Sequence, residues 1–174
     1  WRGDDCPAME GSLRVAAIMR WPGKITPGQV TNEIVHITDV LPTFSRIAGY
    51  EIPEDRIVDG IDQLDFLLGK QKTSLREGFP AFNGDELFAY KWRDWKVHFV
   101  ELNSMFGRPQ RMNVPLVYNT LRDPKESFDV APNSTWILPV VMKRVIAFQK
   151  TLAAEPPIAL GTPDPYEPKA RGGR

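Results

Sequence analysis

The fold is decided by the stretch Glu10-Gly11-Ser12-Leu13-Arg14-Val15-Ala16-Ala17-Ile18-Met19-Arg20-Trp21-Pro22-Gly23-Lys24-Ile25. Its first three residues have the composition of a turn. Residues 15–21 are a short, mostly apolar run of the length typical of a strand buried on both faces, and Pro22-Gly23 ends it. We therefore expect an approach loop and then an internal strand. Because one strand cannot form a buried sheet alone, its neighbours are predicted to lie on polypeptide outside these residues.

The composition is that of one globular domain or a piece of one. The 174 residues are 42% hydrophobic and 25% charged. Lys and Arg together number 22, as do Asp and Glu, so the formal net charge is +0. This balance provides no electrostatic attraction to nucleic acid or to an anionic membrane. No apolar run approaches the ~20 residues needed to span a bilayer. We therefore predict no nucleic-acid partner and no membrane partner.

The N-terminal residues Trp1-Arg2-Gly3-Asp4-Asp5 have neither an initiator Met nor the pattern of a signal peptide. We interpret this end as a cut end, and the cellular location is therefore left unknown. The single cysteine, Cys6, excludes an intrachain disulfide.

The second half of the chain predicts a small sheet covered by a helix. Strands are expected at 79–82, 87–91, 95–100 and 116–119, with a tight turn at 93–94 and a long loop at 101–115. Pro139 suits the first turn of a helix that runs to about Ala154. The apolar stripe Val141, Val145, Phe148 and Leu152 should pack on the sheet. We divide the chain into residues 1–75, 76–155 and an extended Pro- and Gly-rich tail at 156–174.

Two helices are predicted before the sheet. The first spans 36–48, with Thr38 or Asp39 as its N-cap and Gly49 as its C-cap, and its apolar face is expected in the core. The second is short and ends at Gly69. It follows three carboxylates spaced three apart, Asp59, Asp62 and Asp65. Their spacing differs from that of a calcium loop, so a capped helix start is favoured over metal binding.

Few residues point directly to chemistry. A cysteine-protease site would need a histidine beside Cys6, and nothing places His36 or His98 there. The sequence contains no nucleophile elbow, phosphate-binding glycine loop or paired-cysteine zinc site. The triplet at 133–135 matches a glycosylation sequon, but a turn before the helix is favoured. Glu10 and Arg14 allow two interpretations. They form a structural ion pair at the strand entry, or they belong to a loop that faces an anion.

Several blocks, taken together and in this order, resemble the second half of the type I sulfatases, the arylsulfatase family of the alkaline phosphatase superfamily. The similarity spans roughly residues 10–168. After the opening stretch, the blocks are Asp39-Val40-Leu41-Pro42-Thr43-Phe44, Asp59-Gly60-Ile61-Asp62, Leu67-Leu68-Gly69-Lys70, Trp92-Arg93-Asp94-Trp95-Lys96-Val97-His98 and Val117-Tyr118-Asn119-Thr120-Leu121-Arg122-Asp123-Pro124.

The resemblance implies an α+β fragment of the α/β sulfatase fold. Residues 15–21 would join the large mixed sheet of the catalytic domain, and a four-stranded antiparallel sheet packed by the C-terminal helix would follow. It also implies hydrolysis of a sulfate ester by a formylglycine beside a divalent cation, usually calcium. Both groups would lie upstream. We therefore assign no catalytic residue and no metal ligand to this chain, and expect it to be inactive alone. Cys6 is rejected as the formylglycine precursor, because Cys6-Pro7-Ala8-Met9-Glu10 differs from the motif Cys-x-Pro-x-Arg.

The candidate substrate contacts carried by the resemblance are Arg2, Asp5, Glu10, Arg14 and Arg108. Many sulfatases have a sulfate-binding Lys five residues before the Glu that matches Glu10, and Asp5 stands there with the opposite charge. The loop 101–115 is expected to help wall the substrate pocket.

The expected partners are a small-molecule or glycan sulfate ester and the N-terminal catalytic region. Oligomerisation is left open, and the family resemblance is compatible with a periplasmic or secreted protein. Two alternatives are kept. One is a phosphodiesterase or phosphonate ester hydrolase of the same superfamily, and the other is a non-catalytic structural module.

Overall fold

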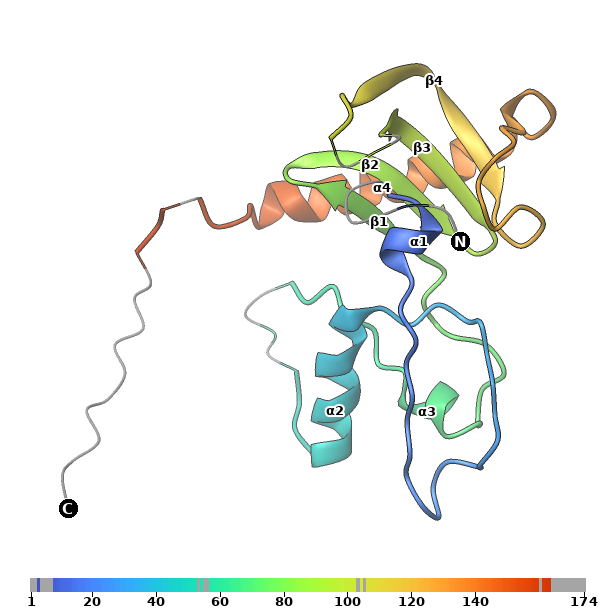
Figure 1. Cartoon of the computed structure of the whole chain (residues 1–174). Helices are drawn as coiled ribbons and strands as arrows, with labels where there is room; N and C mark the ends of the chain where they lie inside the picture. Colours follow the sequence, from blue (N-terminus) through green and yellow to red (C-terminus); the bar gives the residue numbers. More distant parts are fainter. Residues whose placement is uncertain are drawn as a thin grey trace.

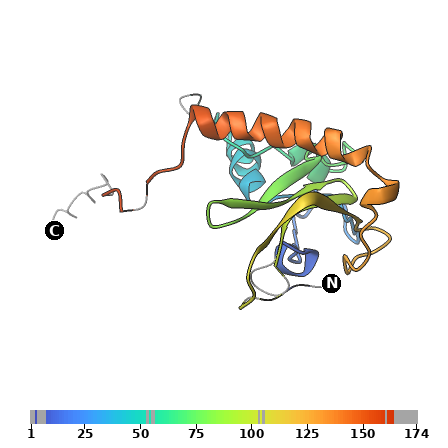
Figure 2. The same cartoon turned by 90° about the horizontal axis from the view of Figure 1, so that it is seen from above.

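The computed structural model describes residue 3 and residues 8–52, 54, 57–102, 104, 106–159 and 161–163. A four-stranded sheet is the centre of the fold, and α4 and α1 lie on its opposite faces (Figure 1, Figure 2). The helices α2 and α3 lie beside each other below the sheet in Figure 1. The elements are α1 (Glu10–Leu13), η1 (Ile37–Asp39), α2 (Val40–Ala48), α3 (Leu64–Leu67), β1 (Gly78–Asn83), β2 (Glu86–Trp92), β3 (Trp95–Glu101), β4 (Gln110–Asn119), η2 (Ala131–Asn133) and α4 (Ile137–Ala154).

The sheet is an antiparallel meander in the order β1-β2-β3-β4, as predicted. The turn between β2 and β3 falls at Arg93-Asp94, where Arg93 adopts a φ of 51°. One irregularity lies between β1 and β2, where Ala81 pairs with Ala89 but Phe82 pairs with Leu87. This bulge leaves Phe88 as an extra residue on β2. As a result, Phe88 and its neighbour Ala89 both pack into the core on the α1 side.

The face of the sheet toward α4 is apolar, and the predicted stripe on the helix is confirmed. Val141 and Val145 are buried against Val97 and Val117 of the sheet. α4 begins at Ile137, so Pro139 lies in its first turn, where no intrahelical N–H is lost. Burial of these β-branched and aliphatic side chains is the main driving force that joins α4 to the sheet.

The fourth strand is longer than the sequence pattern indicated. β4 begins at Gln110, so the connection after β3 covers residues 102–109 and the predicted loop 101–115 is wrong in its second half. Pairing is interrupted between His98 and Val100, and Pro115 lies in this interruption. Proline is tolerated there because β4 is an edge strand and the missing N–H breaks no ladder bond.

Residues 15–21 do not form a strand within the described part of the chain. They run extended away from α1, and Val15 and Ile18 are 88% and 94% exposed. The predicted strand is therefore absent here, since no described segment pairs with it. Its assignment to a larger sheet stays a prediction. The residues before it also differ from the expected loop, because Glu10–Leu13 form one helical turn, α1.

The helix predicted over 36–48 is observed as η1 followed directly by α2, with the predicted C-cap but not the predicted burial. Gly49 has a φ of 76°, and its N–H and that of Tyr50 bond back to the last helical turn. His36 is the N-cap of η1 and forms a capping box with Asp39. Asp39 is in turn the N-cap residue of α2, one of the two positions predicted, although its side chain makes no cap bond there. The expected core face is wrong for this chain, because Leu41 and Phe44 are more than half exposed.

A buried ion pair joins the first part of the chain to the sheet. Asp39 accepts hydrogen bonds from Arg76 Nε at 2.8 Å and from the Ile61 N–H at 2.8 Å. Burial opposes ionisation of Asp39, but the bonds from Arg76, His36 and Ile61 outweigh it and lower the pKa of Asp39. The start of α2, the turn before α3 and the segment leading into β1 thus share one carboxylate.

The described helices include none that combines the length and the apolar character required to cross a bilayer. The domain boundary at residue 75 stays a prediction.

Glu77 provides a test of the electrostatics around the sheet. Its carboxylate binds Arg144 at 2.6 Å and also binds Arg93, and these two bonds lower its pKa to about 2. A depressed carboxyl pKa stabilises the fold above the ordinary value near 4.5, and this contribution is lost as the pH falls toward 2. The side chain is 42% exposed, so we expect an effect below ~1 kcal/mol.

Glu77→Gln should therefore lower the urea concentration at the unfolding midpoint relative to the wild type at pH 7. Near pH 2 the two midpoints should nearly coincide. Denaturation of both proteins across this range measures the difference. If both proteins lost the same stability between pH 5 and pH 2, Glu77 would contribute nothing to the pH dependence of unfolding.

Candidate functional site

The structure describes three of the five predicted substrate contacts. Arg2 and Asp5 lie outside the described residues, as does Cys6. Glu10 and Arg14 lie in and directly after α1. Arg108 is exposed in the connection before β4. Glu10 and Arg14 are brought together, and the role of all five as substrate contacts stays a prediction.

Glu10 is buried between two lysines of the sheet. Lys91 of β2 and Lys96 of β3 are directly opposite in the ladder, so both side chains rise from the same face. Glu10 Oε1 lies 3.2 Å from Lys91 Nζ and 3.1 Å from Lys96 Nζ. The second oxygen, Oε2, lies 3.7 Å from Arg14 Nη1. The carboxylate of Glu10 thus compensates a pair of cations that would otherwise repel each other in the interior.

A second carboxylate, Glu126, completes this arrangement from a distant part of the sequence. Its Oε1 accepts the backbone N–H of Glu10 at 2.6 Å and lies 3.4 Å from Lys96 Nζ. Its Oε2 lies 2.7 Å from His98 Nε2. Glu126 is fully buried and adopts a φ of 52°. We call these five residues, Glu10, Lys91, Lys96, His98 and Glu126, the ion cluster.

Neighbouring side chains hold the edge of the ion cluster. Lys91 Nζ donates to the hydroxyl of Thr120, which donates in turn to the Asp94 carbonyl at 3.0 Å. The His98 ring packs edge-on against Tyr118, with 5.3 Å between the ring centroids. Lys91 therefore has a hydroxyl partner in addition to Glu10, and the His98 ring has an aromatic neighbour in addition to Glu126.

Burial and charge act in opposite directions on the ionisation of the ion cluster. Burial raises the pKa of Glu126, but the His98 hydrogen bond and the charges of Lys96 and His98 outweigh it, and the net pKa is lowered. Burial lowers the pKa of Lys91, and Glu10 opposes this shift only in part. Glu126 is consequently held as the anion beside Lys96.

The sequence analysis missed four members of the ion cluster. Lys96 and His98 alternate with the apolar residues of β3, a pattern typical of a solvated face. That face is instead covered by α1 and by the segment that carries Glu126. No local pattern indicates that this face is covered. Glu10 precedes Lys96 by more than 80 positions, and Glu126 follows it by about 30.

The described residues do not fit a metal. They contain no group of three or more His, Cys, Asp or Glu side chains arranged to hold an ion. Asp62 and Asp65 bind Arg46 at 2.7 and 3.0 Å, and Asp62 also caps the Leu64 N–H at 2.9 Å. Asp62 thus satisfies one N–H at the start of α3, as the sequence favoured, although the N-cap residue itself, Gln63, makes no side-chain cap bond.

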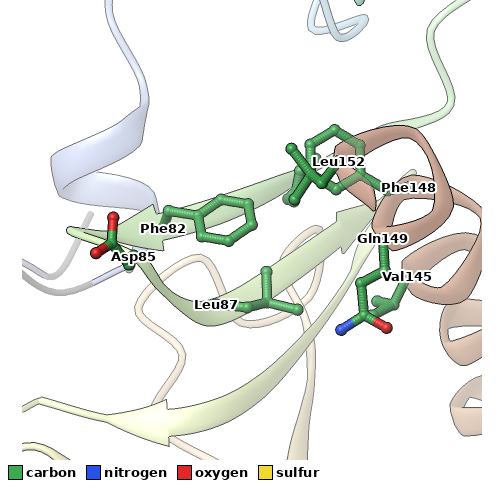
Figure 3. A pocket seen from close by; sticks show the side chains of 8 residues that line it. Phe82, Asp85, Leu87, Val145, Phe148, Gln149 and Leu152 are labelled. Carbon is green, nitrogen blue, oxygen red and sulfur yellow. The ribbon is translucent and has the colours of Figure 1, made fainter. Parts of the chain in front are cut away.

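A separate cavity of about 220 Å³ lies between the β1–β2 hairpin and the C-terminal half of α4 (Figure 3). Its lining is mostly apolar, with Asp85 and Gln149 as the polar members, and includes Pro80, Phe82, Leu87, Val145, Phe148 and Leu152. A sulfate group needs cationic or N–H partners. No basic side chain lines this cavity, so it does not fit the predicted substrate.

Comparisons with known families agree with this architecture. The family model described as the C-terminal region of aryl-sulfatase matches residues 74–166, more than half of the chain. The chain belongs to the sulfatase family. A second model, for the C-terminal part of N-sulphoglucosamine sulphohydrolase, matches residues 4–82. The two matches together include α1, the whole sheet and α4.

Similar sulfatases are known from several organisms. Steryl-sulfatase of Rattus norvegicus is 32% identical over 156 residues, covering 77% of this chain and 27% of the relative. N-acetylgalactosamine-6-sulfatase of Canis lupus familiaris is 31% identical over 174 residues, covering 85% and 33%. The crystal structure of PsFucS1 sulfatase from Pseudoalteromonas sp. superposes with a TM-score of 0.84 at 30% identity, over 91% of this sulfatase chain and 34% of that chain. The chain thus spans about a quarter to a third of these relatives' length.

Removal of Glu10 tests how much the ion cluster stabilises this sulfatase chain. Glu10→Ala leaves Lys91 and Lys96 facing each other without their shared carboxylate. We expect the free energy of unfolding to fall by roughly 3–5 kcal/mol, the range for breaking a buried ion pair. The matched control is Arg14→Ala, at a 3.7 Å contact with 38% of the side chain exposed, which should cost less than ~1 kcal/mol. Urea denaturation measures both, and equal losses would contradict the interpretation.

Proposed function

We propose that the complete protein hydrolyses a sulfate ester and that this chain forms its C-terminal scaffold. The carrying observation is the match of the aryl-sulfatase C-terminal region to residues 74–166. It is supported by the superposition on a sulfatase crystal structure with a TM-score of 0.84. The sheet, α4 and the ion cluster are proposed to act as structural support. No residue of this chain is assigned a covalent step.

The reactive groups are proposed to lie elsewhere in the complete protein. A formylglycine would attack the sulfate ester, and a divalent cation, calcium by family resemblance, would stabilise the negative charge that develops. The described residues offer no metal-binding cluster, so no step is assigned to a metal held by them. The share of the relatives' length that this chain spans, 27% and 33%, leaves room for both groups upstream.

The exposed apolar surface is proposed to receive the catalytic region. Val15 and Ile18 of the unpaired extended segment are almost fully exposed, and Leu41 and Phe44 of α2 are exposed by 56% and 55%. Large apolar side chains exposed together on one helix or segment mark an interaction surface more often than a solvent-facing one. The catalytic region would bury residues 15–21 by pairing a strand with them, and it would bury Leu41 and Phe44 by packing over α2.

The substrate class is proposed from the relatives. One relative is named a steryl-sulfatase and another an N-acetylgalactosamine-6-sulfatase, so sulfated sterols and sulfated sugars are the two classes to compare. No observation on this chain favours the phosphodiesterase or phosphonate alternative.

The proposed activity is tested with the complete protein on a matched panel. We expect hydrolysis of an aryl sulfate and of a sulfated sugar or sterol, with at most weak turnover of the corresponding phosphate diester and phosphonate ester. Alanine in place of the Cys or Ser of an upstream Cys-x-Pro-x-Arg or Ser-x-Pro-x-Arg motif should abolish turnover. Faster cleavage of the phosphate diester, or full activity in that variant, would overturn the proposal.

The proposed docking surface is tested with the isolated chain of residues 1–174. We expect strong binding of an apolar fluorescent dye, because large side chains of α2 face solvent. Leu41→Ser combined with Phe44→Ser should reduce the dye signal. The control pair Arg46→Ser and Lys70→Ser changes polar surface nearby and should not. A monomeric wild-type chain that binds no dye would contradict an unpartnered surface.

A further inference from the structure

Past α4 the chain continues as an extended segment, residues 156–163, which the structure describes except for residue 160. Figure 1 shows it leaving the end of α4 and running away from the sheet. Pro156 and Pro157 favour an extended backbone, and Glu155 before them has a φ of −130° and a ψ of 85°. We call residues 156–163 the arm.

The far end of the arm is a closed turn. Both the N–H and the hydroxyl of Thr162 donate to the Ala159 carbonyl, at 3.1 and 2.7 Å. Gly161 lies inside this turn with a φ of 80°, in the left-handed region that favours glycine. The arm therefore has a defined local shape that does not depend on packing against the sheet.

The arm presents one large apolar side chain and few hydrogen-bond donors. Ile158 is 85% exposed, so the described residues leave its side chain uncovered. The three prolines of the arm have no N–H, and that of Thr162 is used within the turn. Extended proline-containing segments of this kind bind in grooves lined by aromatic side chains, and Trp and Tyr can donate to their carbonyls.

The start of the arm is fixed to the first part of the chain. Both oxygens of the Glu155 carboxylate accept the Ile57 N–H, each at 3.0 Å. This contact across 98 residues joins the end of α4 to the segment that follows α2. Ile57 is itself 44% exposed. The arm thus leaves from the part of the chain that also carries the exposed apolar side chains of α2.

The arm also belongs to the region shared with other sulfatases. The match to the C-terminal region of aryl-sulfatase extends beyond α4 to residue 166. The chain spans only 27% of the rat steryl-sulfatase and 34% of the PsFucS1 chain, so most of such a protein lies outside it. A shared segment with a defined shape and an uncovered apolar side chain points to a partner in that remainder.

We propose that the arm binds in a groove of the catalytic region, with Ile158 as its apolar anchor. The groove is lined by aromatic side chains, whose N–H or O–H groups donate to the carbonyls of Pro156 and Pro157. The inference rests on the proposed function only in requiring the catalytic region.

Photo-crosslinking in the complete protein identifies what covers the arm. A benzophenone amino acid replaces Ile158, and mass spectrometry identifies the crosslinked peptides. We expect crosslinks to the catalytic region of the same molecule, with at least tenfold fewer from the control position Lys150, which is exposed on α4. Crosslinks to a second copy, crosslinks confined to residues 1–174, equal yields from both positions or no crosslinks at all would count against the arm.

Limited proteolysis supplies a second measurement that needs no bulky side chain. Elastase cleaves after small residues and has a site at Ala159 within the arm. Ile158→Asp should raise the cleavage rate there by roughly tenfold or more, because it removes the burial of the anchor. Ile158→Val keeps an apolar anchor and should be cleaved at nearly the wild-type rate. A wild-type protein cleaved as fast as Ile158→Asp would overturn the proposal.

Neither measurement needs turnover, so this inference and the proposed function fail separately. A complete protein that cleaves no sulfate ester but crosslinks Ile158 to its catalytic region would support the arm and contradict the function. An active sulfatase whose arm is cleaved as fast in the wild type as in Ile158→Asp would do the reverse.

Discussion

The fold depends on the compensation of two lysines buried side by side on one face of the sheet. Lys91 and Lys96 are opposite each other in the ladder, and each contacts the carboxylate of Glu10. Two like charges at this distance in a low-dielectric interior are tolerated only with anions between or beside them. The second anion, Glu126, binds the Glu10 backbone as well as Lys96. This requirement fixes α1, the β2–β3 hairpin and the segment after β4 relative to one another.

Both faces of the sheet carry an apolar cluster, and only the α1 face adds buried charges. α4 covers one face with aliphatic side chains, and this contact is stabilised by apolar burial. α1 also makes an apolar contact, because Leu13 packs on the cluster that contains Phe88 and Val100, but its attachment adds buried hydrogen bonds and charge. The part of the chain before the sheet, in contrast, leaves Leu41 and Phe44 exposed.

Local patterns predicted the sheet well because its signals are local. The alternation in β3, the turn at Arg93-Asp94 and the stripe at Val141 and Val145 are each complete within a few residues or turns. The start of β4 was missed since Gln110 and Arg111 are polar and pair at an exposed edge, where no apolar alternation is required. Residues 15–21 have the apolar composition typical of a strand. A strand also needs a partner to pair with, and the described residues provide none.

The sequence by itself determined the family, the order of the strands and the helix that covers them. These follow from periodicity, turn residues and blocks of similarity that are contiguous along the chain. The tertiary structure alone decided that Lys96 and His98 are buried, that Glu126 is their partner and that Glu10 binds inward. The physical reason is that burial of a charge depends on what covers it, and here the cover comes from residues distant in sequence, which no local pattern encodes.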